Sequence, residues 1–378
     1  MSLVDVLGKI QSVVTEFITG NEKTENSEES NSIFSFGQTN QQQDVDELSS
    51  SYYYLAQHIE EQNFIQREIS RNSEHASKFD EMMQQELQMA NLPDPLKKEL
   101  APLFKELATP IDEDERDRLE AKIEEVCEFA NSENPLPENT SQEILRLEIL
   151  ALQSAEGSHV ASLYNQLSNI ESSSGEDFSM YAEIEKTQSE YDKRLSELNI
   201  RLELSYSNFS PEQKSELGLA FFEYMEADSG IKKEDIENQI QMYCAEQGID
   251  EQSPVMLALW SEAITGNLDA QTVDLNKLLK HIDSDEIKEV IITEKNKILD
   301  EAQFKLSGIS MKQWAHHMNL PEDVKGEVFE LINSLQAIEN SDAKELVKDR
   351  ITMLLGTAGV DFEGIAYKNF SNAASIFK

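Results

Sequence analysis

Residues 180–206 read MYAEIEKTQSEYDKRLSELNIRLELSY, and this stretch decides the fold class. Apolar and aromatic residues return in it at alternating steps of three and four, the spacing of a long helix with one continuous seam. That stretch predicts either an intermolecular coiled coil or a long intramolecular hairpin with a helix at 141–171. We favour the hairpin, because only the short break at 171–177 separates the two segments. The seam consists of Tyr181, Ile184, Gln188, Tyr191, Leu195, Leu198 and Leu202.

The same helical spacing extends through most of the chain. Only 14 glycines and 9 prolines occur among 378 residues, which favours long helices with few tight turns. The one β-branched run, EVIITE at 289–294, has flanks with a helical pattern. We therefore predict an all-α fold of elongated, stacked helical bundles, with a long helical hairpin or coiled-coil segment and a flexible N-terminal region.

Changes of composition divide the chain into five segments. Prolines in ENPLPENTSQE (133–143) mark one internal boundary, and the helix start at Ser210 and Pro211 marks another. The predicted segments are 1–20, an amphipathic helix and candidate export signal; 21–50, a flexible linker; 51–134, an N-terminal helical domain; 135–208, the long hairpin; and 209–378, a C-terminal helical domain.

The first fifty residues hold one group of candidate partner-binding residues. Segment 1–20 has a continuous apolar face that needs a partner, either the body of this chain or another protein. Segment 21–50 is rich in Ser, Asn, Gln and Glu, so it buries too little surface to offset the entropy of ordering. Its two phenylalanines form a docking peptide or are simply exposed. The candidate contact residues are Leu3, Val6, Leu7, Ile10, Val14, Phe34 and Phe36.

The net charge restricts the class of partner. The chain carries 73 acidic against 32 basic residues, a formal net charge of −41. Such a surface repels phosphate, so we expect no nucleic-acid partner and favour basic proteins or proteins with apolar grooves. No apolar run approaches the roughly 20 residues of a membrane span, so we expect no membrane insertion. Cys127 and Cys244 are predicted to be reduced thiols of a cytoplasmic protein, which is also a candidate for secretion by a non-Sec route.

The sequence holds no recognisable catalytic or metal-binding pattern. The acidic stretch 111–125 lacks the glycine of a calcium loop and places Arg116 and Arg118 among the would-be ligands. His316 and His317 are neighbours, so on a helix they point about 100° apart and do not chelate one ion. We therefore predict no enzyme activity, no cofactor and no metal.

Residues Ser307–Leu335 read SGISMKQWAHHMNLPEDVKGEVFELINSL. We predict a short helix over 311–318, capped by Ser307 or Ser310, then a turn and a second helix from Pro321 to Ile338. The outline is that of a helix–turn–helix. Its second helix carries four acids against one base near its start, which excludes the usual reading of DNA. The charged residues are Glu322, Asp323, Lys325, Glu327 and Glu330.

This stretch, with SDAKELVKDRITMLL at 341–355, resembles the C-terminal helical module of the type III secretion gatekeeper family. The matching positions are Trp314, Ala315, Leu320, Pro321, Phe329, Leu331 and Arg350. The resemblance implies stacked helical bundles and a non-enzymatic regulator that controls the order of substrate export. It also implies partners among secretion chaperones and apparatus components, a role in virulence, and an export signal within the first 20–50 residues. Trp314, Leu320 and Phe329 are the candidate partner-binding residues of the module.

Two other functions stay open at this stage. A self-associating structural or scaffolding protein, for example of a phage particle, would use the seam at 181–202 for assembly. An injected effector with an unrecognised activity would need a site that no motif reveals.

Overall fold

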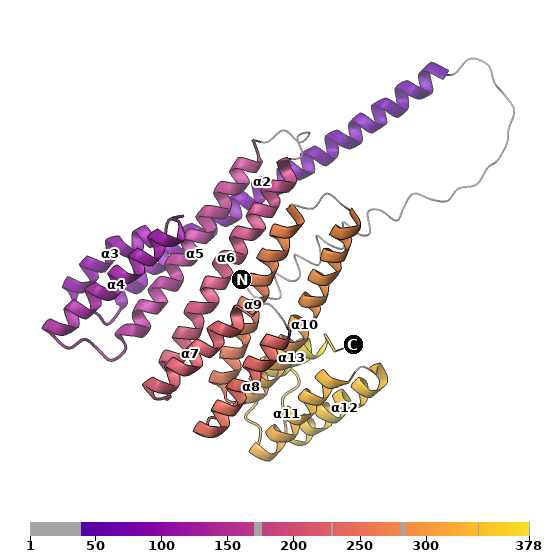
Figure 1. Cartoon of the computed structure of the whole chain (residues 1–378). Helices are drawn as coiled ribbons and strands as arrows, with labels where there is room; N and C mark the ends of the chain where they lie inside the picture. The colour runs from indigo at the N-terminus through magenta and orange to yellow at the C-terminus, as the bar shows by residue number, and fades with distance from the viewer. Residues whose placement is uncertain (1–38, 170–175, 228–229, 281–284, 339, 378) are drawn as a thin grey trace. The chain divides into compact units, whose positions relative to one another are not determined.

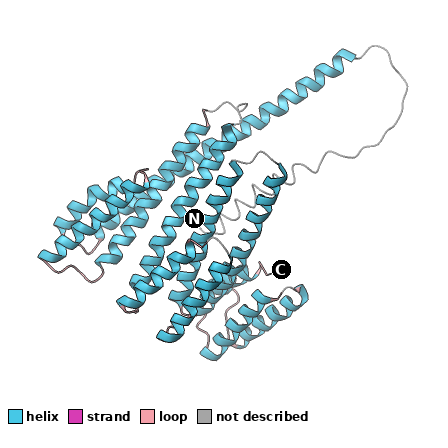
Figure 2. Ribbon diagram, in the orientation of Figure 1, coloured by secondary structure: helices cyan, strands magenta, loops and turns pink. Residues whose placement is uncertain are grey.

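The computed structural model describes residues 39–169, 176–227, 230–280, 285–338 and 340–377. Within these ranges the chain forms twelve helices and no strand, so the all-α prediction is confirmed (Figures 1 and 2). It divides into two units, 1–58 and 59–378, and the packing described below lies within the second. Side chains are described from residue 62 onward, apart from 176–179, 273–274, 276–280, 285–287 and 294.

The helices follow one another with short connections. In chain order they are α2 (Thr39–Met89), α3 (Asp94–Leu107), α4 (Glu113–Glu133), α5 (Thr140–Leu167), α6 (Glu176–Tyr206), α7 (Pro211–Met225), α8 (Gly230–Gln247), α9 (Pro254–Lys280), α10 (Asp285–His317), α11 (Glu322–Ala337), α12 (Ser341–Thr357) and α13 (Ile365–Ala374).

Two local predictions differ from these bounds. Helix α2 begins at Thr39, so the predicted linker 21–50 overlaps a helix over residues 39–50. The predicted short helix at 311–318 is wrong, because α10 continues unbroken from Asp285 to His317. Ser307 is buried within α10, and Gly308 lies so close to Gln336 of α11 that packing between helices stabilises the continuous form. The predicted helix caps at Ser307 and Ser310 are therefore absent.

Helices α2 to α5 share one apolar core in the N-terminal part of the second unit. Pro93 precedes α3 in the extended backbone conformation that proline favours, which separates α3 from α2 as the sequence predicts. Leu100, Phe104 and Ile123 are fully buried in this core. Their burial holds α3 and α4 against the start of α5.

The hairpin predicted from the seam is present within the chain. Helix α6 lies beside α5 on one side and beside α9 on the other (Figure 1). Ile184, Tyr191 and Leu198 of the seam are 2%, 4% and 1% exposed. They pack with α5 side chains such as Val160 and Leu152, so the seam is occupied by the chain's own helix.

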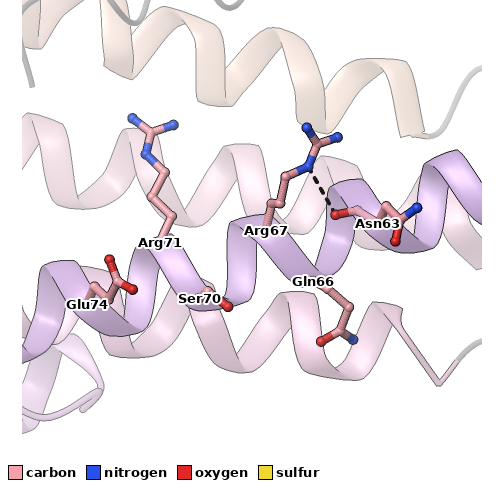
Figure 3. A pocket seen from close by; sticks show the side chains of 6 residues that line it. All are labelled: Asn63, Gln66, Arg67, Ser70, Arg71 and Glu74. Carbon is pink, nitrogen blue, oxygen red and sulfur yellow. Dashed lines mark hydrogen bonds between the residues drawn. The ribbon is translucent and has the colours of Figure 1, made fainter.

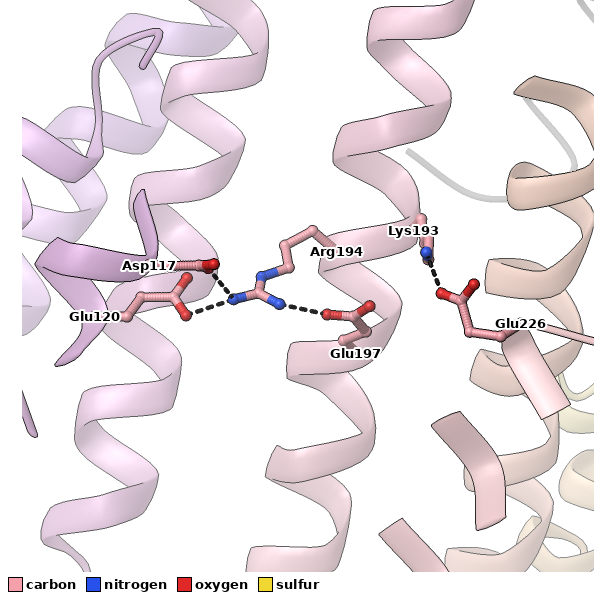
Figure 4. Close-up of polar contacts among 6 residues, drawn as sticks. All are labelled: Asp117, Glu120, Lys193, Arg194, Glu197 and Glu226. Atoms are coloured by element: carbon pink, nitrogen blue, oxygen red, sulfur yellow. Dashed lines mark hydrogen bonds and ion pairs between the residues drawn. The ribbon is translucent and has the colours of Figure 1, made fainter. Parts of the chain in front are cut away.

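Charged side chains add contacts between α6 and its neighbours. Arg194 of α6 lies between carboxylates, with Nη2 2.6 Å from Glu120 of α4 and Nη1 2.6 Å from Glu197 (Figure 4). The adjacent Lys193 pairs with Glu226, just beyond α7, on the other side of α6 (Figure 4). In a chain with so few bases, these two cations cross-link three helices. Such pairs fix geometry more than they add stability.

Candidate partner-binding site

The C-terminal module (residues 304–377) consists of the end of α10 together with α11, α12 and α13. Its core draws apolar side chains from all four helices, and Phe377 is fully buried with its ring centroid 4.5 Å from that of Phe304. Asn319 turns the chain between α10 and α11 with a φ of 50°, a left-handed conformation that asparagine tolerates. The turn between α10 and α11 therefore lies at Asn319-Leu320-Pro321, where the sequence predicts it.

Two of the predicted contact residues of this module lie inside it. Leu320 and Phe329 are 6% and 7% exposed and belong to the module's core, so they support a surface without forming one. Trp314 is partly buried, with its ring 5.4 Å from that of His317. The sequence pattern identified the apolar positions of a helical pair correctly, but it did not distinguish inward-facing from outward-facing ones.

The remaining predicted contact residues lie outside the described part of the chain. They are Leu3, Val6, Leu7, Ile10, Val14, Phe34 and Phe36.

The adjacent histidines have structural contacts. Nε2 of His316 lies 2.7 Å from the carbonyl oxygen of Gln252, and the His316 ring centroid lies 5.2 Å from that of Phe329. His317 packs against Trp314 instead. Across the described residues, no three His, Cys, Asp or Glu side chains are grouped so that they could hold a metal ion.

Four large apolar residues are exposed on the outside of the C-terminal module. Leu346 and Met353 of α12 are 71% and 53% exposed, and a spacing of seven residues places them on the same face, two turns apart. Gly356 lies one helical turn after Met353 in α12. The Cζ atom of Phe362 is 3.4 Å from the position that a Cβ would take on Gly356. Ile365, at the start of α13, is 76% exposed. We call Leu346, Met353, Phe362 and Ile365 the apolar strip.

A small cavity lies inside the C-terminal module, near Phe362 of the apolar strip. It has a volume of about 240 Å³ and lies between α10, α12 and α13, with Met311, Ile351 and Phe370 in its wall. Tyr367 also lines it, and the ring centroid of Tyr367 is 4.5 Å from that of Phe362 in the strip. An aromatic pair therefore links Phe362 to the cavity, whereas Leu346 and Met353 lie on the face of α12 opposite Ile351. Exposed apolar surfaces of this kind are typical of protein contact sites.

The bases beside the apolar strip are paired with acids. Arg350 donates to Glu327 of α11 from both Nε, at 3.2 Å, and Nη2, at 2.7 Å. Lys348 lies 2.7 Å from Glu345, and Lys368 lies 3.0 Å from Glu363. With these pairs neutralised, Asp342, Asp349 and Asp361 give the surroundings of the strip a negative charge. A partner that contacts the strip would be complementary if it carried basic residues around an apolar centre.

A second cavity, on α2, has a different character. Its volume is about 910 Å³, and its lining is polar throughout (Figure 3). Arg67 and Arg71 project from the same side of α2, and Arg67 donates to the Asn63 carbonyl oxygen at 3.1 Å (Figure 3). Nη1 of Arg71 lies 3.8 Å from a carboxylate oxygen of Glu68. No apolar residue of the described chain lines this second cavity. We therefore favour the apolar strip as the functional site.

The two cysteines are poor nucleophiles. Burial, followed by the nearby carboxylates of Glu148 and Glu124, raises the pKa of Cys127 to about 11. Burial, followed by Glu251, raises the pKa of Cys244 to about 11 as well. Both thiols are therefore protonated near neutral pH. Nucleophilic chemistry would require the deprotonated thiolate.

The sequence analysis did not predict the apolar strip as a contact surface, although the sequence contains one pattern that could have indicated it. Leu346 and Met353 are apolar positions spaced by seven residues, which matches an exposed face as well as a buried one. Comparison of the chain with protein-family models, with curated proteins and with solved structures finds no match.

Among the described residues, no helix has the length and apolarity needed to cross a bilayer.

Proposed function

We propose that this chain is a non-enzymatic helical protein that binds other proteins through the apolar strip. The observation that carries the proposal is the exposure of Leu346, Met353 and Ile365 on the outside of the C-terminal module. Leaving such a surface in water is unfavourable, and burying it against a partner recovers that free energy. The acidic surroundings favour a partner whose contact surface combines apolar and basic residues.

In the cell, we assign this binding to the control of export order by a type III secretion system. The resemblance to the gatekeeper family falls on the same C-terminal module that carries the apolar strip. Residues 1–50 would then act as export signal and chaperone-binding segment, because an apolar-faced segment that orders on contact suits a chaperone groove. The chain would be cytoplasmic before export by a non-Sec route.

Self-association through the seam receives less support. Its central residues Ile184, Tyr191 and Leu198 are buried against the chain's own α5. Assembly through the seam would require the hairpin to open first. The buried seam therefore argues against the scaffolding alternative.

The binding proposal predicts that charge on the apolar strip abolishes partner capture. Met353→Asp is expected to weaken binding at least about tenfold, because an ionised carboxylate replaces an apolar contact. The measurement is recovery of the bound partner on immobilised full-length chain from lysate of the source cells, followed by the affinity of the purified pair. Met242→Asp is the matched control, since Met242 is 60% exposed on α8, against 53% for Met353.

A second matched pair separates site from residue type. Ile365→Asp in the apolar strip should weaken binding, whereas Ile231→Asp on α8 should not, and the two isoleucines are 76% and 77% exposed. Equal losses in the strip variants and their controls would contradict a specific surface. Unchanged binding in both strip variants would reject the site.

The export proposal predicts a change in timing in living cells. Removal of the gene should release effectors before translocators, and the wild-type chain should restore the order. A chain with Met353→Asp should fold but fail to restore it, because the regulator no longer reaches its partner. Secreted proteins sampled over time would show this. Normal order in the deletion strain would refute the gatekeeper assignment while leaving the binding result untouched.

A further inference from the structure

Helices α5, α6 and α9 bring four carboxyl groups together inside the second unit. Glu156 comes from α5, Asp192 from α6, and Glu262 and Asp269 from α9. The carboxyl of Asp269 interacts electrostatically with each of the other three. Its Oδ2 atom is buried and has no hydrogen-bond partner among the described residues. We call these four residues the carboxyl cluster.

The helices approach closely at the carboxyl cluster. A Cβ on Gly266 of α9 would lie 3.1 Å from Cβ of Ser196 on α6. Between them, Glu262 accepts hydrogen bonds from Asn199 Nδ2, at 3.2 Å, and from the Ser196 hydroxyl. All four residues of the carboxyl cluster are partly buried, so their ionised carboxylates would be incompletely hydrated.

Several bases on the surrounding helices pair with groups outside the carboxyl cluster. On α6, Lys193 pairs with Glu226 after α7, and Arg194 pairs with Glu120 of α4. From α10, Lys295 lies 2.7 Å from Glu185 of α6. On α5, His159 lies within 3.5 Å of the Tyr191 hydroxyl. The other acid facing the cluster is Glu203 of α6, which adds negative charge near Glu262.

These surroundings favour protonated carboxyls. Burial, followed by Asp192, raises the pKa of Glu156 to about 8. Burial raises the pKa of Asp192 to about 6. For Asp269, burial is the main cause and the neighbouring carboxyls add to it, so its pKa lies well above the usual value. At mildly acidic pH the cluster is therefore largely neutral.

We propose that the carboxyl cluster is a proton-dependent switch that holds α9 against α6 when protonated and releases it when ionised. Protonation of Asp269 removes one negative charge from the cluster, whereas three or four ionised carboxylates in the cluster repel one another. In an opened form, water solvates the carboxylates and they ionise at their ordinary lower pKa values. Rising pH therefore favours the opened form.

The switch joins the two halves of the second unit. Helices α2 to α6 precede it in the chain, and α10 to α13, with the apolar strip, follow it. A change of pH near neutrality would therefore alter the contact between the hairpin and the helices that follow α9. This inference does not depend on the identity of the partner or on the proposed role in secretion.

Amide hydrogen exchange of the full-length chain tests the switch. Between pH 6 and pH 8.5, after correction for intrinsic exchange rates, protection in α9 should fall by at least about tenfold, whereas protection in α11 should change by less than about threefold. In the triple variant Glu156→Gln, Asp192→Asn and Asp269→Asn, α9 protection should be nearly independent of pH. Amides resemble the protonated acids, so this variant should fold.

Control variants separate an effect of the carboxyl cluster from a general effect of pH on the protein. Glu246→Gln on the exposed surface of α8 should keep the wild-type response to pH. If wild-type α9 protection does not fall with pH, or falls equally in α11, the switch is refuted. An undiminished pH response in the triple variant refutes it too. Should the triple variant not fold, the same comparison with Asp269→Asn alone decides, because that residue interacts with all three partners.

Discussion

Replacing Gly157 of α5 by alanine is expected to destabilise the second unit by about 3 kcal/mol, the upper end of overpacking effects. A Cβ at Gly157 would lie 2.8 Å from the carbonyl oxygen of Asn72 and 2.9 Å from the amide nitrogen of Ala76, both in α2. These are backbone atoms, so no rotamer change relieves the clash and α2 must move as a helix. That movement would also stretch the 3.1 Å hydrogen bond from the Ser154 hydroxyl to the Ala76 carbonyl.

Thermal denaturation followed by circular dichroism measures the effect of Gly157→Ala. A loss of about 3 kcal/mol corresponds to a fall in Tm of roughly 4–5 °C for a unit of this size. Gly326→Ala is the control, because a Cβ at Gly326 in α11 meets no atom within 4 Å. Because alanine has a higher helix propensity than glycine, Gly326→Ala should instead raise the stability by about 0.5–1 kcal/mol. An equal response of both variants would show that the α2–α5 crossing is not tightly packed.

Glu148→Gln is expected to stabilise the protein at pH 8 and to leave its stability nearly unchanged at pH 4.5. Glu148 of α5 is 6% exposed, and burial, followed by the charge of Glu120, raises its pKa to about 8. In the unfolded chain this carboxyl ionises near its ordinary value of about 4.3. Between these values the folded state binds the extra proton, so stability falls as pH rises. The full effect is on the order of 4 kcal/mol by pH 8.

Urea denaturation of the wild type and Glu148→Gln across pH 4.5–8.5 would measure this difference. The two curves should converge at the acidic end and separate progressively towards pH 8, with the glutamine variant more stable. Glu246→Gln, at an exposed position on α8, should follow the wild type throughout. A constant difference at all pH values would mean that Glu148 acts through packing or hydrogen bonds and not through its proton.

The seam illustrates what local pattern predicts well. Tyr181 to Leu202 repeat at helical spacing, and α6 occupies that stretch with the predicted face turned inward. Periodicity succeeds here because one face of a long helix must leave water, whatever its partner is. The hairpin partner also followed from the short connection to α5.

Short local signals were less reliable near the C-terminus. Ser307 and Ser310 resemble helix caps, but α10 passes through them because Gly308 packs directly against Gln336 of α11. Likewise, Phe377 is fully buried beside Phe304, although no strong helical pattern surrounds it in the sequence. Contacts between distant residues outweigh a cap that stabilises a helix end by only about 1 kcal/mol.

By itself, the sequence determined the all-α class, the long hairpin and the acidic surface, because periodicity and charge are properties of neighbouring residues. Only the tertiary structure decided which apolar residues face outward in the apolar strip and which acids meet in the carboxyl cluster. Among 73 acids, nothing local marks Asp269 as different. Its loss of water and its proton depend on helices that lie far apart along the chain.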